Sequence, residues 1–288
     1  MQSLGPIFRN LRLEKQLTLK DTAKGIVSQP FLSNFETGKS GISADKLFAL
    51  LQRLKVSPEE FYRLASFYNS VSIYEFLNSL APGLVNEDIY FLNKKLEELN
   101  EKKENFDSIF YTHFRIFIEQ SINLYSNTPL NTSEINIISQ YLLYNDNWGN
   151  YEIHLYANFI KFIPLKINKI LIKKSKKSAS QYVGKENYKH SVVLIYINFI
   201  NHLIRENELL FANDLIDNIM KDLINTKYFY EITKLNYLKG KLTIAQGNIE
   251  DGLKIAQKSI DIMYNLEAFS IAQAHKKALK DFIDSLES

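Results

Sequence analysis

Apolar residues recur every three or four positions along most of the chain, a spacing that predicts helices. The first such run begins near Leu4 and ends near Gln16. Four further short helices are expected, each after a hydroxyl residue that can cap its free N–H groups: Thr18, Ser28, Ser43 and Ser57. Gly38 follows the third helix, where glycine readily adopts the left-handed conformation of a helix C-terminus. Residues 1–66 are therefore predicted to form a small five-helix domain.

From about residue 67 onward the spacing is again helical, and no segment is typical of a strand. The helices expected there are 72–81, 86–99, 104–126, 132–146, 149–162, 164–174, 187–206, 208–225, 227–246, 248–264 and 267–286. Breaks are expected at Pro82-Gly83, Asn127 to Pro129, Trp148-Gly149, Lys173 to Ser180 and Gly247-Asn248. The second part of the chain is thus predicted to be an array of helices.

The segment from Tyr237 to Ile260 resembles one tetratricopeptide repeat. Its small residues, Gly240, Gly252 and Ala256, stand where two paired helices must approach closely. Stacked pairs of this kind form a curved solenoid with a concave binding face. The predicted fold class is all-α, with the five-helix domain at 1–66, a linker at 67–72 and an α-solenoid of tetratricopeptide-like helix pairs at 73–288.

The composition supports long helices and an intracellular protein. Only 10 glycines and 6 prolines occur in 288 residues, fewer than a sandwich or barrel with many turns would need. The absence of cysteine excludes disulfides, zinc–thiolate sites and thiol nucleophiles, and it fits a reducing compartment. Since no apolar run approaches the ~20 residues that span a bilayer, we expect a cytoplasmic protein with no membrane partner.

Residues 1–65 are basic, whereas the rest of the chain is nearly neutral. Ten lysines and arginines face six acidic residues in that segment, giving it a net charge of +4. A basic head on a near-neutral body is what contact with phosphates by one domain requires.

Residues suited to catalysis are not grouped in the sequence. The five histidines are scattered without metal-ligand spacing, and no phosphate-binding glycine loop or nucleophile elbow occurs. We therefore expect no enzyme, no metal and no cofactor.

The first 65 residues resemble the lambda-repressor-like (XRE-type) helix-turn-helix domain. The residues that carry this resemblance are Leu11-Arg12, Leu17-Thr18, Ala23, Leu32-Ser33, Phe35-Glu36 and Gly38. The resemblance implies a domain that binds double-stranded promoter DNA and places its third helix in the major groove.

Five residues of that third helix are candidates for reading bases. Gln29 and Asn34 can each form two hydrogen bonds with adenine, and Ser33 can bond a base or a phosphate. Pro30 or Phe31 can touch a thymine methyl group. The alternative for Gln29 and Asn34 is that both are only solvated polar residues on a small helix.

Other head residues are assigned to the DNA backbone or to the fold. Lys39 and Ser40, in the loop after the third helix, and Lys20, at the start of the second, are suited to phosphate contact. Arg12 and Glu36 correspond in this family to a partly buried ion pair that joins the first and third helices, so we expect a structural role for both.

The complete chain resembles the Rgg/GadR/MutR family of transcription regulators. The head contributes Leu32-Ser33, Phe35-Glu36, Gly38 and Ile42-Ser43 to the resemblance, and the body contributes residues 148–158, Asn198 and 238–240. The resemblance implies a homodimer whose repeat domain binds a short signalling peptide, which changes how the paired heads engage a promoter.

Asparagines about 40 residues apart are candidates for holding such a peptide. Asn158, Asn198 and Asn236 are spaced as successive inner helices of a solenoid would be, and an amide can satisfy both polar groups of a peptide backbone. Tyr237 could form a pocket for an apolar side chain, and Lys161 could pair with a carboxylate. The alternative is structural, because the chain is rich in asparagine and aromatics at helical spacing are usually core.

The sequence thus predicts a dimeric DNA-binding regulator of the quorum-sensing type, controlled by a peptide. Apolar positions of the last two helices are candidates for the subunit contact: Leu253, Ile260, Ile262, Leu266, Ile271, Leu279, Phe282 and Ile283. The alternative is a helical-repeat module that binds a folded protein partner, with the head only tethering it to DNA.

Overall fold

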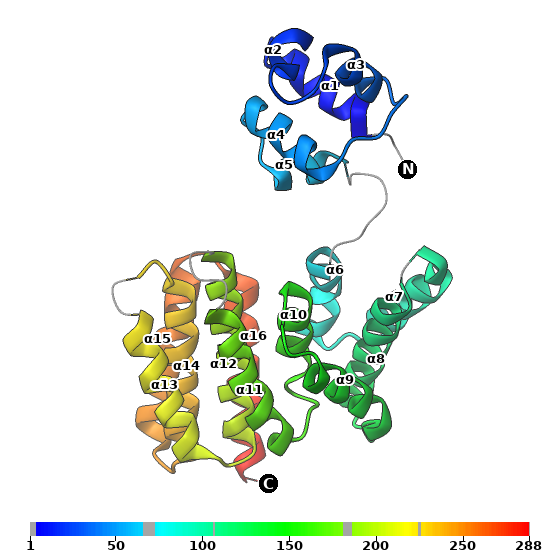
Figure 1. Cartoon of the computed structure of the whole chain (residues 1–288). Coiled ribbons are helices and arrows are strands. Elements are labelled where there is room, and N and C mark those ends of the chain that lie inside the picture. Colours follow the sequence, from blue (N-terminus) through cyan, green and yellow to red (C-terminus); the bar gives the residue numbers. More distant parts are fainter. Residues whose placement is uncertain (1–3, 66–72, 106, 181–185, 224–225, 288) are drawn as a thin grey trace. The chain divides into compact units, whose positions relative to one another are not determined.

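The computed structural model of the chain describes residues 4–65, 73–105, 107–180, 186–223 and 226–287. It divides into two compact units, residues 1–72 and 73–288, which we call the head and the repeat unit (Figure 1). The predicted linker at 67–72 lies outside the described residues.

The head contains the five short helices that the sequence predicts. They are α1 (Leu4–Glu14), α2 (Leu19–Ala23), α3 (Gln29–Glu36), α4 (Ala44–Leu54) and α5 (Pro58–Ala65). The hydroxyls of Thr18 and Ser28 accept hydrogen bonds from the N–H groups of Asp21 and Phe31, so both residues are N-caps as expected. The helices enclose a core of Phe8, Ala23, Leu32, Phe35, Leu50, Leu51, Leu54, Val56 and Phe61.

Close approach of α1 to the end of α3 depends on Gly5. A Cβ atom at this position would lie 1.7 Å from the backbone oxygen of Phe35. Only glycine therefore allows α1 to pack this closely on the C-terminal turn of α3.

The repeat unit is also helical, and the part of it that the structure describes has no strand. Its α-helices are α6 (Ile73–Asn86), α7 (Ile89–Glu101), α8 (Ser108–Tyr125), α9 (Thr132–Tyr144), α10 (Asn150–Phe159), α11 (Leu165–Ser180), α12 (Glu186–Arg205), α13 (Leu209–Leu223), α14 (Phe229–Ala245), α15 (Ile249–Asn265) and α16 (Phe269–Glu287). Within the described ranges, none of the helices combines the length and apolar character needed to cross a membrane.

Helices from α10 onward alternate between two layers. The helices α10, α12, α14 and α16 pack in succession, each against the next, while α11, α13 and α15 connect them (Figure 1). The tightest pair is α14 with α15, where a Cβ at Gly240 would lie 2.6 Å from the backbone nitrogen of Ala256. A Cβ at Gly252 would lie 2.7 Å from the Gly240 oxygen, so the small residues of the repeat-like segment do mark a close helix contact.

The predicted helix break at Pro82-Gly83 is wrong, because α6 continues through both residues to Asn86. Proline removes the hydrogen bond to the carbonyl of Asn78, but Asn78 and Pro82 are both exposed, so water can bond that carbonyl instead. The helix ends instead at Asn86, because the next residue, Glu87, has a left-handed backbone with a φ of 55°.

The break predicted from Lys173 to Ser180 is also wrong, since α11 runs unbroken to Ser180. Ser175 and Ser178 are buried, and the ammonium of Lys174 donates to the carbonyl oxygen of Leu143 at 2.6 Å. One side of this polar run thus packs on the chain and bonds the end of α9, while Lys173, Lys176 and Lys177 are exposed on the helix.

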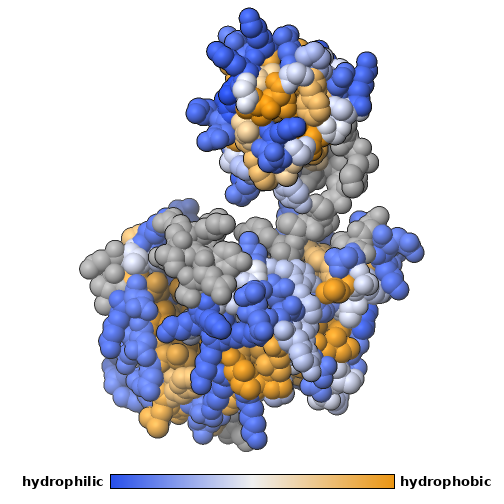
Figure 2. All heavy atoms as spheres, in the orientation of Figure 1, coloured by the Kyte–Doolittle hydropathy of each residue, from blue (hydrophilic) through white to orange (hydrophobic). Residues whose placement is uncertain are grey.

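The last two helices divide their apolar residues between core and surface. Ile260 and Leu279 are buried, whereas Leu253 and Ile262 are exposed and Leu266 is 72% exposed. Figure 2 shows apolar side chains reaching the visible surface of the repeat unit between hydrophilic ones. Part of the predicted subunit-contact set is therefore occupied within the chain itself.

Candidate functional site

Helix α3 presents its candidate base-reading residues at its start and along one face. Ser28 fixes the N-terminus, and Pro30 lies in the first turn, where a missing N–H breaks no helix bond. Gln29, Pro30 and Asn34 are exposed, and Phe31 and Ser33 are half-buried. Leu32 and Phe35 are buried in the head core, so the opposite side of α3 is left to meet a ligand.

Asn34, in the last turn of α3, forms hydrogen bonds with the loop that follows the helix. Its carbonyl oxygen accepts from the backbone N–H of Lys39 at 2.8 Å and of Ser40 at 3.3 Å. The Lys39 side chain is exposed, as is that of Lys20 in the first turn of α2. The ammonium of Lys46, on α4, lies 5.5 Å from the centre of the Phe31 ring, which adds a cation that the sequence did not single out.

Arg12 and Glu36 form a buried two-bond ion pair between α1 and α3. Arg12 Nε donates to Glu36 Oε1 at 2.6 Å, and Arg12 Nη2 donates to Glu36 Oε2 at 2.7 Å. A third bond runs from Arg12 Nη1 to the carbonyl oxygen of Leu17, 2.8 Å away. The pair is structural, because neither side chain is accessible from outside.

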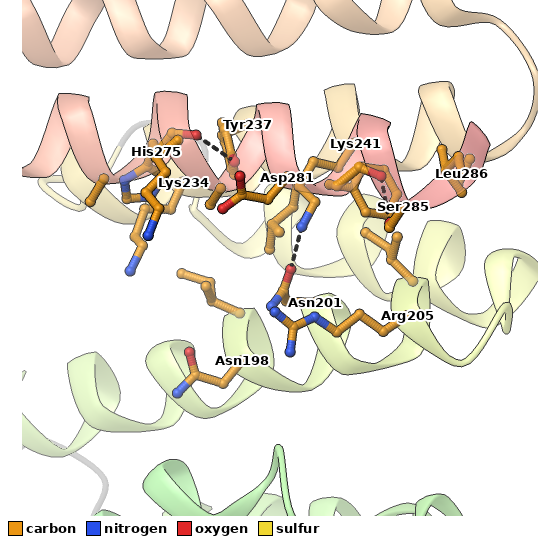
Figure 3. A pocket seen from close by; sticks show the side chains of 18 of the residues that line it. Asn198, Asn201, Arg205, Lys234, Tyr237, Lys241, His275, Asp281, Ser285 and Leu286 are labelled. Atoms are coloured by element: carbon orange, nitrogen blue, oxygen red, sulfur yellow. Dashed lines mark hydrogen bonds between the residues drawn. The ribbon is translucent and has the colours of Figure 1, made fainter. Parts of the chain in front are cut away.

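The repeat unit has a cavity of about 950 Å³ between α12, α14 and α16, with Val85 and Glu87 at its edge (Figure 3). This volume is at the upper end of the range of about 300–1,000 Å³ for ligand sites. Apolar lining comes from Val85, Ile197, Ile204, Leu238, Phe282 and Leu286. Polar side chains face them from the same three helices, so the cavity can hold an elongated ligand with both apolar and polar groups.

Asn198, Asn201 and Arg205 follow one another along one face of α12, opposite α14 and α16 (Figure 3). The Asn198 amide donates through Nδ2 to the carbonyl oxygen of Ala157 at 2.9 Å, which leaves its oxygen available. The Asn201 oxygen accepts from Lys241 Nζ at 2.9 Å, which leaves the Asn201 NH₂ available. Neighbouring amides thus offer one acceptor and one donor group to the cavity.

The cavity has an excess of positive charge. Lys277 is paired with Glu87, with Nζ 3.1 Å from Oε2. Arg205, Lys234 and Lys241 remain, and Asp281 is the remaining acid among the lining residues. Burial, together with the nearby Arg205 guanidinium, lowers the pKa of Lys241 from 10.5 to about 8.

Two of the five predicted peptide-binding residues, Asn198 and Tyr237, line this cavity. The Tyr237 hydroxyl donates to the carbonyl oxygen of His275 at 2.9 Å, and burial raises its pKa. The structure does not bring Asn158, Asn236 or Lys161 to the cavity lining.

The side chains of those three residues are half-buried, and two have internal partners. Asn158 Nδ2 donates to the carbonyl oxygen of His154 in its own helix at 2.8 Å. The Lys161 ammonium lies 4.7 Å from the centre of the Phe162 ring, and burial lowers the pKa of Lys161 to about 8.

Sequence reasoning missed Asn201, Arg205 and Lys241, although a signal for them was present. Asn201 and Arg205 stand three and seven positions after Asn198, and Lys241 stands four positions after Tyr237. Residues at these spacings share one helix face, so Asn198 and Tyr237 already marked the faces that line the cavity.

Both units match families of known proteins. The sequence pattern of the family described as "HTH-type transcriptional regulator Rgg, C-terminal domain" matches residues 93–277. The helix-turn-helix pattern matches residues 8–61.

Three solved structures share the fold along nearly the full chain. A putative transcriptional regulator from Listeria monocytogenes EGD-e is 21% identical, with a TM-score of 0.79 over 99% of this chain and 98% of that one. The SHP pheromone receptor Rgg2 of Streptococcus dysgalactiae is 23% identical, with a TM-score of 0.73 over 96% and 99%. PlcR of Bacillus thuringiensis, in complex with the peptide PapR7 and DNA, is 17% identical, with a TM-score of 0.63 over 97% and 99%.

The family match covers well over half of the chain, and the helix-turn-helix match covers most of the head. Both agree with the two units and with the capped helix α3 described above. This chain belongs to the Rgg family of helix-turn-helix transcriptional regulators.

Proposed function

We propose that the chain acts in the cytoplasm as a homodimer that binds promoter DNA through α3 of each head. A short signalling peptide binds in the cavity between α12, α14 and α16 and controls how the bound dimer regulates transcription. Two proteins of similar structure support this proposal: Rgg2 is a pheromone receptor, and PlcR was solved in complex with a peptide and DNA.

The pair of amides on α12 is the observation that carries the peptide proposal. An extended peptide buried in a cavity needs partners for its N–H and C=O groups, since an unsatisfied buried group costs about 1–3 kcal/mol. The free oxygen of Asn198 can accept from a peptide N–H, and the free NH₂ of Asn201 can donate to a peptide carbonyl. The apolar lining between them suits side chains of the same peptide.

Dimerisation follows from what one head can read. A single small helix-turn-helix contacts few base pairs, and two heads on a pseudo-palindrome multiply affinity and specificity. Exposed apolar residues of the last two helices, Leu253, Ile262, Leu266 and Phe269, are our candidates for the contact between subunits.

The DNA part of the proposal is tested by fluorescence anisotropy of the DNA upstream of the chain's own coding sequence. We expect salt-sensitive binding that weakens in Gln29→Ala and Asn34→Ala, because both lose contacts to base edges. Equal affinity for that DNA and for unrelated DNA of the same length would contradict it.

The peptide part of the proposal is tested with a defined mixture of peptides, which we call the octapeptide pool. Its members carry fluorescein at the N-terminus and have leucine, valine, phenylalanine, serine or glycine at each position and a free C-terminal carboxylate. We expect anisotropy to rise with the full chain and to rise less with Asn198→Ala. No binding of the pool would contradict the peptide proposal and favour a folded protein partner for the repeat unit.

A further inference from the structure

The cavity wall contains a buried ammonium group that no carboxylate of the described residues neutralises. Lys241 is 4% exposed, and its Nζ donates to the oxygen of Asn201 at 2.9 Å. The same ammonium lies 4.4 Å from the centre of the Phe282 ring, which stabilises a cation but does not neutralise it. Buried charges are normally paired with an opposite charge, and the described residues supply no anion for this ammonium.

A second cation without an acidic partner lies beside the first. Arg205 is exposed at the end of α12 and lines the same cavity, and across the residues that the structure describes it has no ion pair. Its charge acts on Lys241, with the effect of favouring the neutral form of the lysine. Lys277, by contrast, has Glu87 as its partner in this cavity. Lys234, which also lines the cavity, lies 5.2 Å from the centre of the Tyr230 ring.

We propose that Lys241 and Arg205 together bind a carboxylate of the peptide, namely its C-terminal carboxylate. This inference rests on the proposed function and adds the end and the orientation of the ligand. A carboxylate has two oxygens that accept from an ammonium and from a guanidinium at once, and such charge-assisted bonds are the strong ones. The NH₂ of Asn201 is beside Lys241 and is free to donate as well.

The position of this subsite sets the direction of the peptide. With its carboxylate at Lys241 and Arg205, the peptide backbone runs along α12 toward Asn198, whose amide oxygen accepts from an N–H group. Phe282 and Leu238 then lie beside the last side chain of the peptide. An aspartate or glutamate side chain has the same chemistry, so the experiment must separate the two sources.

Three versions of the octapeptide pool make that separation. The first has the free C-terminal carboxylate, the second is the C-terminal carboxamide, and the third is the carboxamide with one glutamate at a varied position. We expect the full chain to bind the free acid at least about tenfold more tightly than the carboxamide, because a buried charge left unpaired is costly.

Other outcomes are equally decisive. Tight binding of the glutamate-containing carboxamide would support the carboxylate subsite with a side chain as its source and overturn the C-terminal assignment. Equal binding of acid and carboxamide would overturn the inference while the proposed function stands. Binding of no pool would overturn both.

Variants locate the effect at the two cations. Lys241→Met keeps the apolar stem beside Phe282, and Arg205→Gln changes an exposed residue, so the second variant remains informative if the first does not fold. We expect each to remove the preference for the free acid and Lys241→Arg to restore part of it. Lys239→Met is the control, since Lys239 is exposed on the same helix and outside the cavity lining. A preference unchanged in Arg205→Gln and Lys241→Met would contradict the assignment.

Discussion

The charge of Lys241 destabilises the folded chain when the cavity is empty. Its pKa lies near 8 rather than 10.5, and burial is the main cause. At pH 7 the charged lysine therefore costs the fold up to about 3 kcal/mol, by the usual conversion of a pKa difference to free energy. We predict that Lys241→Met raises the free energy of unfolding by an amount of this order, as expected where function opposes stability.

The stability that Lys241→Met gains over the wild type should depend on pH. Between pH 8 and 10.5 the unfolded chain holds more protons at Lys241 than the folded chain, so wild-type stability rises with pH over this window. The advantage of Lys241→Met should therefore be largest below pH 8 and shrink toward pH 10.5. Other charged or titratable groups line this cavity: Glu87 after α6, Arg205 of α12, Lys234 and Tyr237 of α14, and His275, Lys277 and Asp281 of α16. All of them are present in the wild type and in the variant, so the difference between the two isolates Lys241. Urea unfolding of the variant and of Lys239→Met across this range checks the prediction, and an advantage that grows with pH would contradict it.

Breaking the ion pair of Arg12 and Glu36 should lower the stability of the head alone. Glu36→Gln leaves a buried guanidinium without its counter-charge, which should destabilise the head by about 3–5 kcal/mol. Trp148, the chain's one tryptophan, is buried in the repeat unit, so its fluorescence reports that unit while circular dichroism reports both.

We expect urea unfolding of Glu36→Gln to show an earlier transition by circular dichroism and an unchanged one by Trp148 fluorescence. The same curves as wild type by both probes would show that the pair does not stabilise the head.

The close contact between α14 and α15 leads us to expect that replacing Gly240 destabilises the repeat unit. A methyl group at Gly240 would lie within 3 Å of backbone atoms of α15, which cannot move independently. Gly240→Ala should therefore destabilise the repeat unit by about 1–3 kcal/mol, the usual effect of overpacking. A lower urea midpoint by Trp148 fluorescence would confirm this. Gly41→Ala, where a Cβ meets nothing within 4 Å, is the control and should leave the midpoint unchanged.

Helix positions were predictable wherever capping chemistry is local. Thr18 and Ser28 mark helix starts because the hydrogen bonds that define an N-cap lie within three residues. The error at 173–180 arose because packing on distant residues buries Ser175 and Ser178 of α11, which local sequence does not show. The error at Pro82 has another cause: α6 tolerates this proline because it is exposed to water.

The candidate sites were predictable to different degrees for the same reason. The candidate DNA-reading face lies on one short helix, so a single amphipathic pattern predicts it. The cavity combines side chains from α12, α14 and α16, and a 40-residue spacing alone did not tell Asn198 from Asn158. Which amide faces the cavity depends on how each helix is rotated, which only tertiary packing fixes.

For the complete chain, the two kinds of DNA contact predict two different variant effects. Gln29→Ala should weaken binding to the chain's own upstream DNA by roughly tenfold or more and leave unrelated DNA unaffected, because it removes base readout. Lys39→Ala should weaken binding to both DNAs and lower the slope of log affinity against log salt by about 1. Anisotropy titrations across salt concentrations measure both effects, with Arg63→Ala on α5 as the control. A uniform loss in Gln29→Ala would contradict its assignment.

Peptide binding and DNA regulation must be linked reciprocally if one controls the other. The most direct measurement is transcription from the chain's own upstream DNA by purified RNA polymerase, with the full chain and with or without the free-acid octapeptide pool. The transcript level responds whether the peptide changes DNA affinity or only the arrangement of bound heads. We predict that the pool changes the transcript level with the wild-type chain and that Arg205→Gln needs about tenfold more of the pool for the same change. The same transcript level with and without the pool for the wild-type chain would contradict peptide control by this cavity.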